Sequence, residues 1–70
     1  MSAESLGDAL PREMARVRDT VLAVYLTLGP GGAPAAMLMR RDLGAAERAL
    51  EDGDVEEMSR VYRSLTGRQL

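Results

Sequence analysis

Apolar residues recur at alternating intervals of three and four along three stretches of the chain, which is the spacing of one face of an α-helix. The first stripe comprises Leu10, Met14, Val17, Val21, Val24 and Leu28, and Tyr25 widens it. The second stripe comprises Ala36, Met39, Leu43, Ala46 and Leu50. The third comprises Val55, Met58, Val61, Tyr62 and Leu65. This pattern predicts helices at about residues 9–28, 34–51 and 55–66, packed as a compact three-helix bundle.

Two glycine-containing segments separate the predicted helices. Proline lacks a backbone N–H and glycine disfavours helix, so Gly29-Pro30-Gly31-Gly32 is expected to end the first helix. Proline is favoured at the first helical position, so the second helix can begin at Pro30 or at Pro34. Gly53 can adopt the left-handed conformation that ends a helix. The sequence therefore predicts one turn on each side of the second helix.

Side chains that can cap a helix precede the first and third helices. Ser5 or Asp8 can cap the first helix, and Pro11 is tolerated in its first turn. Asp54 can cap the third helix, and Glu57, three residues later, completes a capping-box pattern. These signals support the predicted starts of both helices.

Within the second helix, two residues depart from the apolar stripe. Met37 falls on another face and is expected to be exposed. Gly44 costs about 1 kcal/mol relative to alanine, so it is either tolerated or used for close packing.

Length and composition indicate a single all-α domain of residues 1–70. Residues 1–7 are predicted to be a flexible arm and residues 67–70 a frayed tail. A domain of this size buries only about 60% of its unfolded surface, and the chain has no cysteine for a disulfide. Small cores without such support often gain stability from self-association, so a homodimer is a hypothesis to test.

The residue types that are missing bear on chemistry. The absence of histidine and cysteine removes the usual general base and the commonest metal ligands. The sequence also has no nucleophile with a partner base and no phosphate-binding loop after a strand. It therefore predicts a protein that is not an enzyme and needs no cofactor or metal.

The charge balance disfavours direct binding to nucleic acid. All nine basic residues are arginine, and the formal net charge is −2, whereas nucleic-acid-binding domains are normally basic. No apolar run approaches the roughly 20 residues of a membrane span. The segment Met1–Ser5 has no signal-peptide pattern. We therefore expect a cytoplasmic protein without membrane contact.

The densest charge of the chain lies at the second predicted turn. We call this group of side chains the acidic corner: Glu47, Glu51, Asp52, Asp54, Glu56 and Glu57. Acidic residues favour the first turn of a helix, which accounts for the last three members. Capping does not account for Glu51 and Asp52. The corner is therefore a candidate docking surface for a basic partner, with Arg40 and Arg41 on a neighbouring face; a solvated helix face is the alternative.

Two other interpretations of the corner fit the residues less well. A calcium loop requires alternating ligands and a central glycine that this turn lacks. The spacing of Ala49 and Gly53 matches a DNA-binding helix-turn-helix, but Ser59 stands where that motif has a buried aliphatic residue. DNA phosphates would also repel the acidic turn.

Three segments of the chain carry a resemblance to a known class of proteins: Leu10–Asp19, the Gly29-Pro30 break leading to Ala36–Arg40, and Gly53-Asp54-Val55 followed by Met58. They are similar to short helical reading frames of phages and prophages of GC-rich proteobacteria. The resemblance implies small acidic proteins that bind and disable a host machine, such as anti-CRISPR proteins and inhibitors of host transcription. It implies no particular functional residue.

These observations lead to one functional hypothesis and two alternatives. We expect a small protein-binding inhibitor, encoded by a phage or mobile element, that occludes a basic surface of a host protein or ribonucleoprotein complex with its acidic corner. One alternative is a dimeric nucleic-acid-associated regulator that acts through its arginines. The other is a structural subunit of an assembly.

Overall fold

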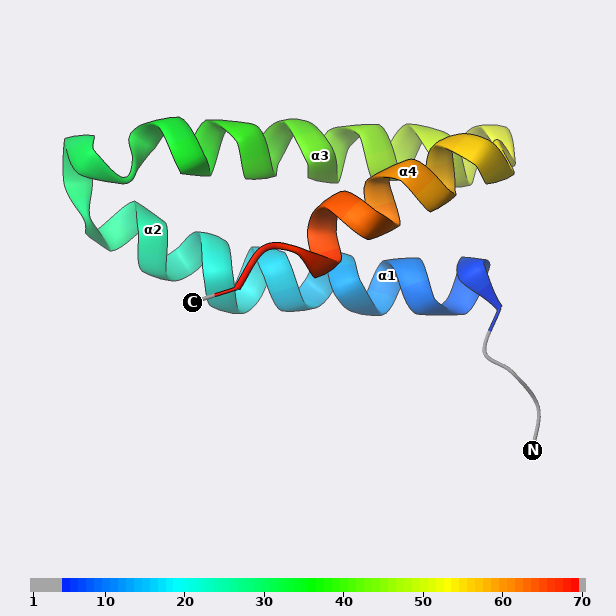
Figure 1. Cartoon of the computed structure of the whole chain (residues 1–70), viewed down its shortest axis with the longest axis horizontal. Helices are drawn as coiled ribbons and strands as arrows, with labels where there is room; N and C mark the ends of the chain where they lie inside the picture. Colours follow the sequence, from blue (N-terminus) through cyan, green and yellow to red (C-terminus); the bar gives the residue numbers. More distant parts are fainter. Residues whose placement is uncertain (1–4, 70) are drawn as a thin grey trace.

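The chain folds into helices joined by two tight turns. The computed structural model describes residues 5–69, and Figure 1 shows their arrangement. The elements in order are α1 (Leu6–Arg16), the π-helical turn η1 (Val17–Leu22), α2 (Ala23–Thr27), the 3-10 turn η2 (Gly29–Gly31), α3 (Ala33–Asp52) and α4 (Val55–Thr66).

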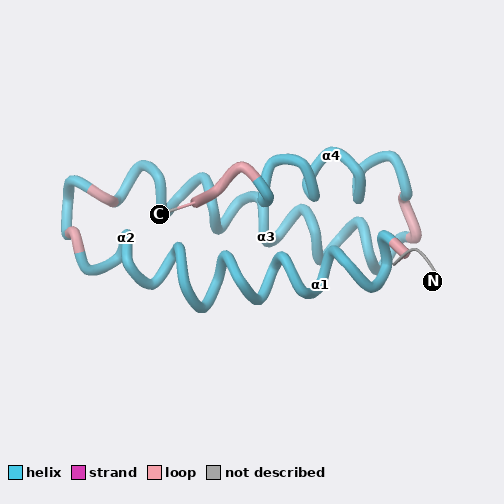
Figure 2. The backbone as a smooth tube through the Cα atoms, turned by 60° about the horizontal axis from the view of Figure 1, so that its bottom comes forward, coloured by secondary structure: helices cyan, strands magenta, loops and turns pink. Residues whose placement is uncertain are grey.

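Three helical segments form the bundle. α1, η1 and α2 run on as one arm, α3 returns antiparallel to it, and the shorter α4 crosses both obliquely (Figures 1 and 2). The molecule measures 40 × 26 × 15 Å along its principal axes. The prediction of an all-α three-helix bundle is confirmed for residues 5–69. In that part of the chain, no helix is long and apolar enough to cross a membrane.

The boundaries of the first helix differ from the prediction. Ser5 caps it, since its Oγ accepts a hydrogen bond from the backbone N–H of Asp8 at 3.2 Å. Helix therefore begins at Leu6, inside the segment predicted as a flexible arm; residues 1–4 lie outside the described part. Pro11 consequently lies inside α1 rather than in its first turn.

The end of the first apolar stripe is also corrected by the structure. Val24 and Leu28 are exposed, whereas Leu22 is buried and Tyr25 is half-buried. The π turn explains the change, because it contains one more residue than an α turn. Each residue after η1 is thus displaced by one position from the α-helical register, and the buried face moves one residue along the sequence.

The two later helices match their predicted ranges closely. α3 begins at Ala33 with Pro34 in its first turn, which selects the later of the two predicted starts, and Pro30 lies within η2. Gly32 is buried between these elements, and a Cβ there would lie 2.2 Å from the backbone oxygen of Tyr25. Only glycine allows this close approach of the two backbones.

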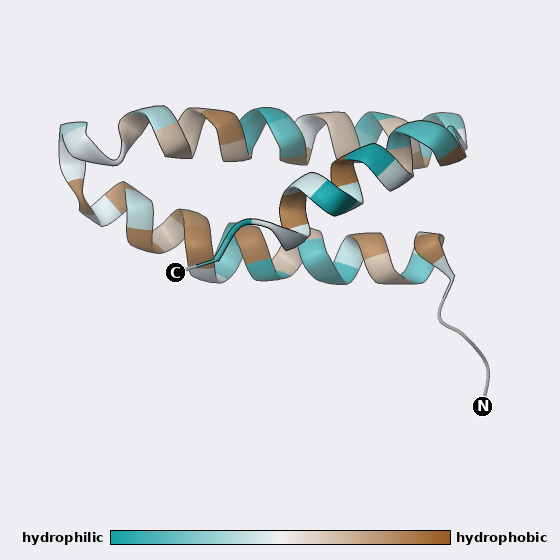
Figure 3. Cartoon of the chain, viewed as in Figure 1, coloured by the Kyte–Doolittle hydropathy of each residue, from teal (hydrophilic) through white to brown (hydrophobic). Residues whose placement is uncertain are grey.

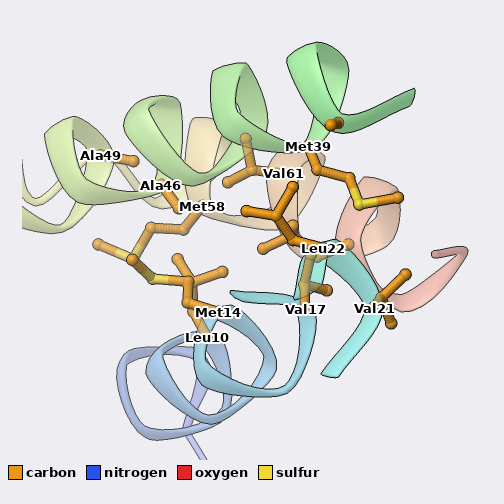
Figure 4. Close-up of a cluster of buried hydrophobic side chains, with 12 residues drawn as sticks. Leu10, Met14, Val17, Val21, Leu22, Met39, Ala46, Ala49, Met58 and Val61 are labelled. Atoms are coloured by element: carbon orange, nitrogen blue, oxygen red, sulfur yellow. The ribbon is translucent and has the colours of Figure 1, made fainter. Parts of the chain in front are cut away.

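The core lies between α1 with η1, α3 and α4, as Figure 4 shows. Twelve residues form it: Leu10, Met14, Val17, Val21, Leu22, Ala36, Met39, Ala46, Ala49, Met58, Val61 and Leu65. Leu43 and Leu50, expected in the core, are only half-buried, and Ala49 takes a central place. Alanines on α3 let α4 approach closely, so small side chains set the spacing of the helices.

A polar network fixes the C-terminal end of α4. Arg16 donates from Nη2 to the backbone oxygen of Leu65 at 2.9 Å and pairs with Glu13 through its Nε at 3.1 Å. Asp42 accepts a hydrogen bond from Ser64 Oγ at 2.6 Å and pairs with Arg68 at 3.6 Å. These contacts link the C-terminal end of α4 to α1 and to α3.

Gly44 offers a test of helix packing. A Cβ at this position would meet only Arg48 Nη1, at an ordinary 3.5 Å, so the glycine is not used for close packing. Gly44→Ala should raise the free energy of unfolding by up to about 1 kcal/mol, since alanine has the higher helix propensity. The matched control Gly32→Ala should lower it by about 1–3 kcal/mol through the clash with Tyr25. Urea denaturation followed by circular dichroism measures both, and a destabilised Gly44→Ala variant would contradict the assignment.

The contribution of Asp42 is also testable. Its carboxylate is 14% exposed, and truncation leaves both Ser64 and Arg68 without their partner. Asp42→Ala should lower the free energy of unfolding by about 1–3 kcal/mol. Asp19→Ala removes an exposed carboxylate paired only with Arg18 and should leave stability unchanged within error. Equal effects of the two substitutions in the same denaturation experiment would argue against the network.

Candidate docking site at the junction of α3 and α4

Backbone hydrogen bonds close the turn between α3 and α4. Gly53 adopts φ 66°, and its N–H donates to the oxygen of Leu50 at 3.4 Å. The N–H of Asp54 donates to the oxygen of Ala49 at 3.0 Å. This pattern is the Schellman motif, which satisfies the last carbonyls of a helix. The acidic corner is therefore built on a well-defined turn.

Asp54 caps α4, as predicted. Its Oδ1 accepts a hydrogen bond from the backbone N–H of Glu57 at 3.1 Å. The reciprocal half of the capping box is not formed, because the N–H of Asp54 is already bonded to Ala49 and the carboxylate of Glu57 pairs with Arg60. Of the predicted capping box, only the hydrogen bond accepted by the Asp54 side chain is formed.

The six acidic residues of the corner have different surroundings. Arg60 donates from Nε to both carboxylate oxygens of Glu57, at 3.1 and 3.0 Å. This hydrogen bond holds the pKa of the Glu57 carboxyl below its ordinary value, and the positive charges of Arg60 and Arg48 add to the effect. Glu47 instead lies within electrostatic range of Arg18 on η1. Arg60 therefore compensates the charge of Glu57, and Arg18 attracts the charge of Glu47.

The remaining four carboxylates form the uncompensated part of the corner. Glu51, Asp52, Asp54 and Glu56 are all exposed, and no ion pair engages them within residues 5–69. They flank the turn over six consecutive positions at one end of the bundle (Figure 1). This group concentrates negative charge at one end of the molecule.

Helix electrostatics divide these four carboxylates further. Glu56 lies in the first turn of α4, where negative charge is stabilising. Asp52 is the last residue of α3 and Glu51 precedes it; at this end of a helix, the dipole disfavours negative charge. The negative charges of Glu51 and Asp52 are therefore unfavourable for the stability of α3.

Val55 is a member of this surface that the sequence pattern placed in the core. Its exposed fraction is 63%, because it stands at the first position of α4, beyond the residues that pack against α3. The sequence signal for this exposure was the position of Val55 directly after the capping residue Asp54. An exposed valine among carboxylates gives the corner an apolar contact point.

Arg40 and Arg41 do not lie at the corner. Both are exposed on α3, and Arg41 precedes Asp52 by eleven positions, which corresponds to roughly 17 Å along the helix axis. The structure therefore brings the acidic residues together and leaves these two arginines on a separate stretch of α3.

The described part of the chain offers no enclosed site. Residues 5–69 enclose no pocket, and none of their acidic residues gather into a group arranged to hold a metal ion. Comparison with protein-family models, curated proteins and solved structures found no match. A functional proposal for this protein therefore depends on the geometry and charge of the acidic corner.

The pairing of Glu57 predicts a pH dependence. Because its pKa is lowered in the folded state, the stabilisation from this carboxylate is present above the unfolded pKa and is lost as the pH falls through the folded value. An NMR titration should give Glu57 a pKa below the ordinary value for glutamate, and Arg60→Ala should return it towards that value. An unchanged pKa in Arg60→Ala would show that the pair does not persist in solution.

Proposed function

We propose that this protein is a non-enzymatic binding protein whose acidic corner docks onto a basic surface of a protein or ribonucleoprotein partner. The observation that carries the proposal is the placement of Glu51 and Asp52. They are exposed, uncompensated within residues 5–69, and located where the dipole of α3 disfavours them. A role in partner recognition gives these carboxylates a purpose that helix stability does not.

The proposed mechanism is occlusion of the partner's surface. Four uncompensated carboxylates at one end of the bundle complement a basic surface, and opposite charges speed and orient the encounter. Val55 supplies exposed apolar area beside these carboxylates, so this surface combines an apolar contact with charged surroundings. Occlusion needs no catalytic group and no bound cofactor.

The resemblance to phage and prophage proteins supports a host machine as the target. We infer an inhibitor of the anti-CRISPR kind, which would block a host defence complex in the cytoplasm of the infected cell. Such a complex presents basic grooves for nucleic acid, so it offers the surface that the corner requires.

Charge reversal at the corner tests the proposal. The protein and its Glu51→Lys/Asp52→Lys variant are used as baits in an extract of the host cells. Retained proteins are identified by mass spectrometry. We expect basic partners to bind the unmodified protein and to lose at least about tenfold in affinity for the variant. The variant should be as stable as the unmodified protein or slightly more so, since lysine suits the end of α3.

Two controls separate the corner from general charge effects. Asp19→Lys reverses an exposed charge on η1 and should leave partner binding intact. Titration with duplex DNA over a salt series addresses the alternative regulator. Partner binding that survives reversal of Glu51 and Asp52, or tight duplex binding with a steep salt dependence, would overturn the proposal.

A further inference from the structure

The end of the molecule opposite the acidic corner carries no charged side chain. All nine basic and all eleven acidic residues of the chain lie before residue 20 or after residue 39. Residues 20–39 form the last part of η1, then α2, η2 and the first two turns of α3. We call this segment the uncharged tip. Figure 3 shows the contrast between this end and the hydrophilic surface of α4.

Exposed apolar side chains gather at the uncharged tip. Six large hydrophobic residues are exposed in the described part of the chain, and five of them belong to the tip: Val24, Leu26, Leu28, Met37 and Leu38. Their exposed fractions range from 41% for Val24 to 69% for Met37. The sixth is Val55 of the acidic corner.

The length of α4 explains this exposure. α4 has 12 residues and α3 has 20, so α4 is shorter by roughly 12 Å. Figures 1 and 2 show that α4 lies over α1 and the C-terminal part of α3 and ends before α2. The α2–α3 end therefore lacks the third layer that covers the rest of the bundle.

We propose that the uncharged tip is the contact surface of a homodimer, in which it packs against the tip of a second copy of this chain. A twofold contact places the same patch on both partners, so every charge near the axis would face its own equivalent. A patch without charges meets no such repulsion, and its hydrophobic residues bury one another. The proposal does not depend on the function of the acidic corner.

The border of the tip fits the same arrangement. Arg18 and Asp19 pair at 3.0 Å on one side, and Arg40 and Arg41 are exposed on the other. The rim therefore carries both signs of charge around an apolar centre, which is the usual anatomy of a protein interface. Opposite charges from the two copies can meet at such a rim.

A lipid surface is the less suitable occupant. The tip contains the turn Gly29–Gly32, whose members Gly29 and Gly31 are exposed, and irregular backbone exposed to lipid leaves polar groups unsatisfied. The net charge of −2 also disfavours the anionic headgroups that recruit interfacial helices. A second protein surface can instead hydrogen-bond to this backbone.

Sedimentation equilibrium of the full chain from micromolar to near-millimolar concentration measures the association. We expect a reversible monomer–dimer equilibrium for the unmodified protein. Leu38→Glu and Leu28→Glu should each weaken it by at least about tenfold, since they place like charges at the contact. Both residues are exposed in the single chain, so circular dichroism should show unchanged helicity.

The matched control introduces the same charge at the opposite end. Val55→Glu also replaces an exposed aliphatic residue and should leave the dimer intact. A monomer at every concentration, a dimer that survives both tip substitutions, or dissociation by Val55→Glu would each overturn the proposal. Binding of the unmodified monomer to phosphatidylcholine vesicles would overturn it in favour of a lipid surface.

Spin labels then place the two copies relative to one another. The chain has no cysteine, so Gly31→Cys and Val55→Cys give single labelling sites, and a side chain at Gly31 enters open space. In the proposed dimer, the distance between labels at position 31 is shorter than that at position 55. The reverse order would show that another surface forms the dimer.

Discussion

The packing of α4 against α3 and the continuous arm of α1, η1 and α2 organises this molecule. Met58, Val61 and Leu65 of α4 are buried in the core, where α4 packs against α1 and α3, and apolar burial is the main stabilising term in a core of this size. α4 has little more than half the length of α3. It therefore completes the bundle at one end, where its turn from α3 exposes the acidic residues, and leaves the other end with two layers.

Much of this fold could be predicted from local physical chemistry. The two later helices follow from their apolar spacing, and the turn between them follows from Gly53 and the cap at Asp54. The phase of the first arm could not be predicted, because periodicity assumes a constant number of residues per turn. The π turn at Val17–Leu22 breaks that assumption, and no residue type in it announces the break.

The candidate site was only partly accessible from sequence. The six acidic residues lie close together in the sequence, between positions 47 and 57, so their clustering could be predicted without tertiary information. The pairing of Glu57 with Arg60 is also local, since the two residues lie three positions apart on α4. The proximity of Glu47 to Arg18 does depend on the tertiary fold, because it requires that α3 and η1 face one another. The exposure of Val55 likewise depends on where packing against α3 begins. One pair within α4 and one tertiary contact thus reduce the six candidate carboxylates to four uncompensated ones.

Charge along α3 connects the two ends of the molecule. The helix begins with apolar residues, continues through Arg40 and Arg41, and ends in Glu51 and Asp52. Its dipole would favour the opposite order, with acids at the start and cations at the end. Helix stability alone therefore does not account for the sequence of α3. The two proposed interfaces would account for it, because the uncharged first two turns of α3 suit the proposed symmetric contact and its acidic last turn suits a basic partner. In these proposals, α3 is a spacer that keeps the two proposed contact surfaces roughly 30 Å apart.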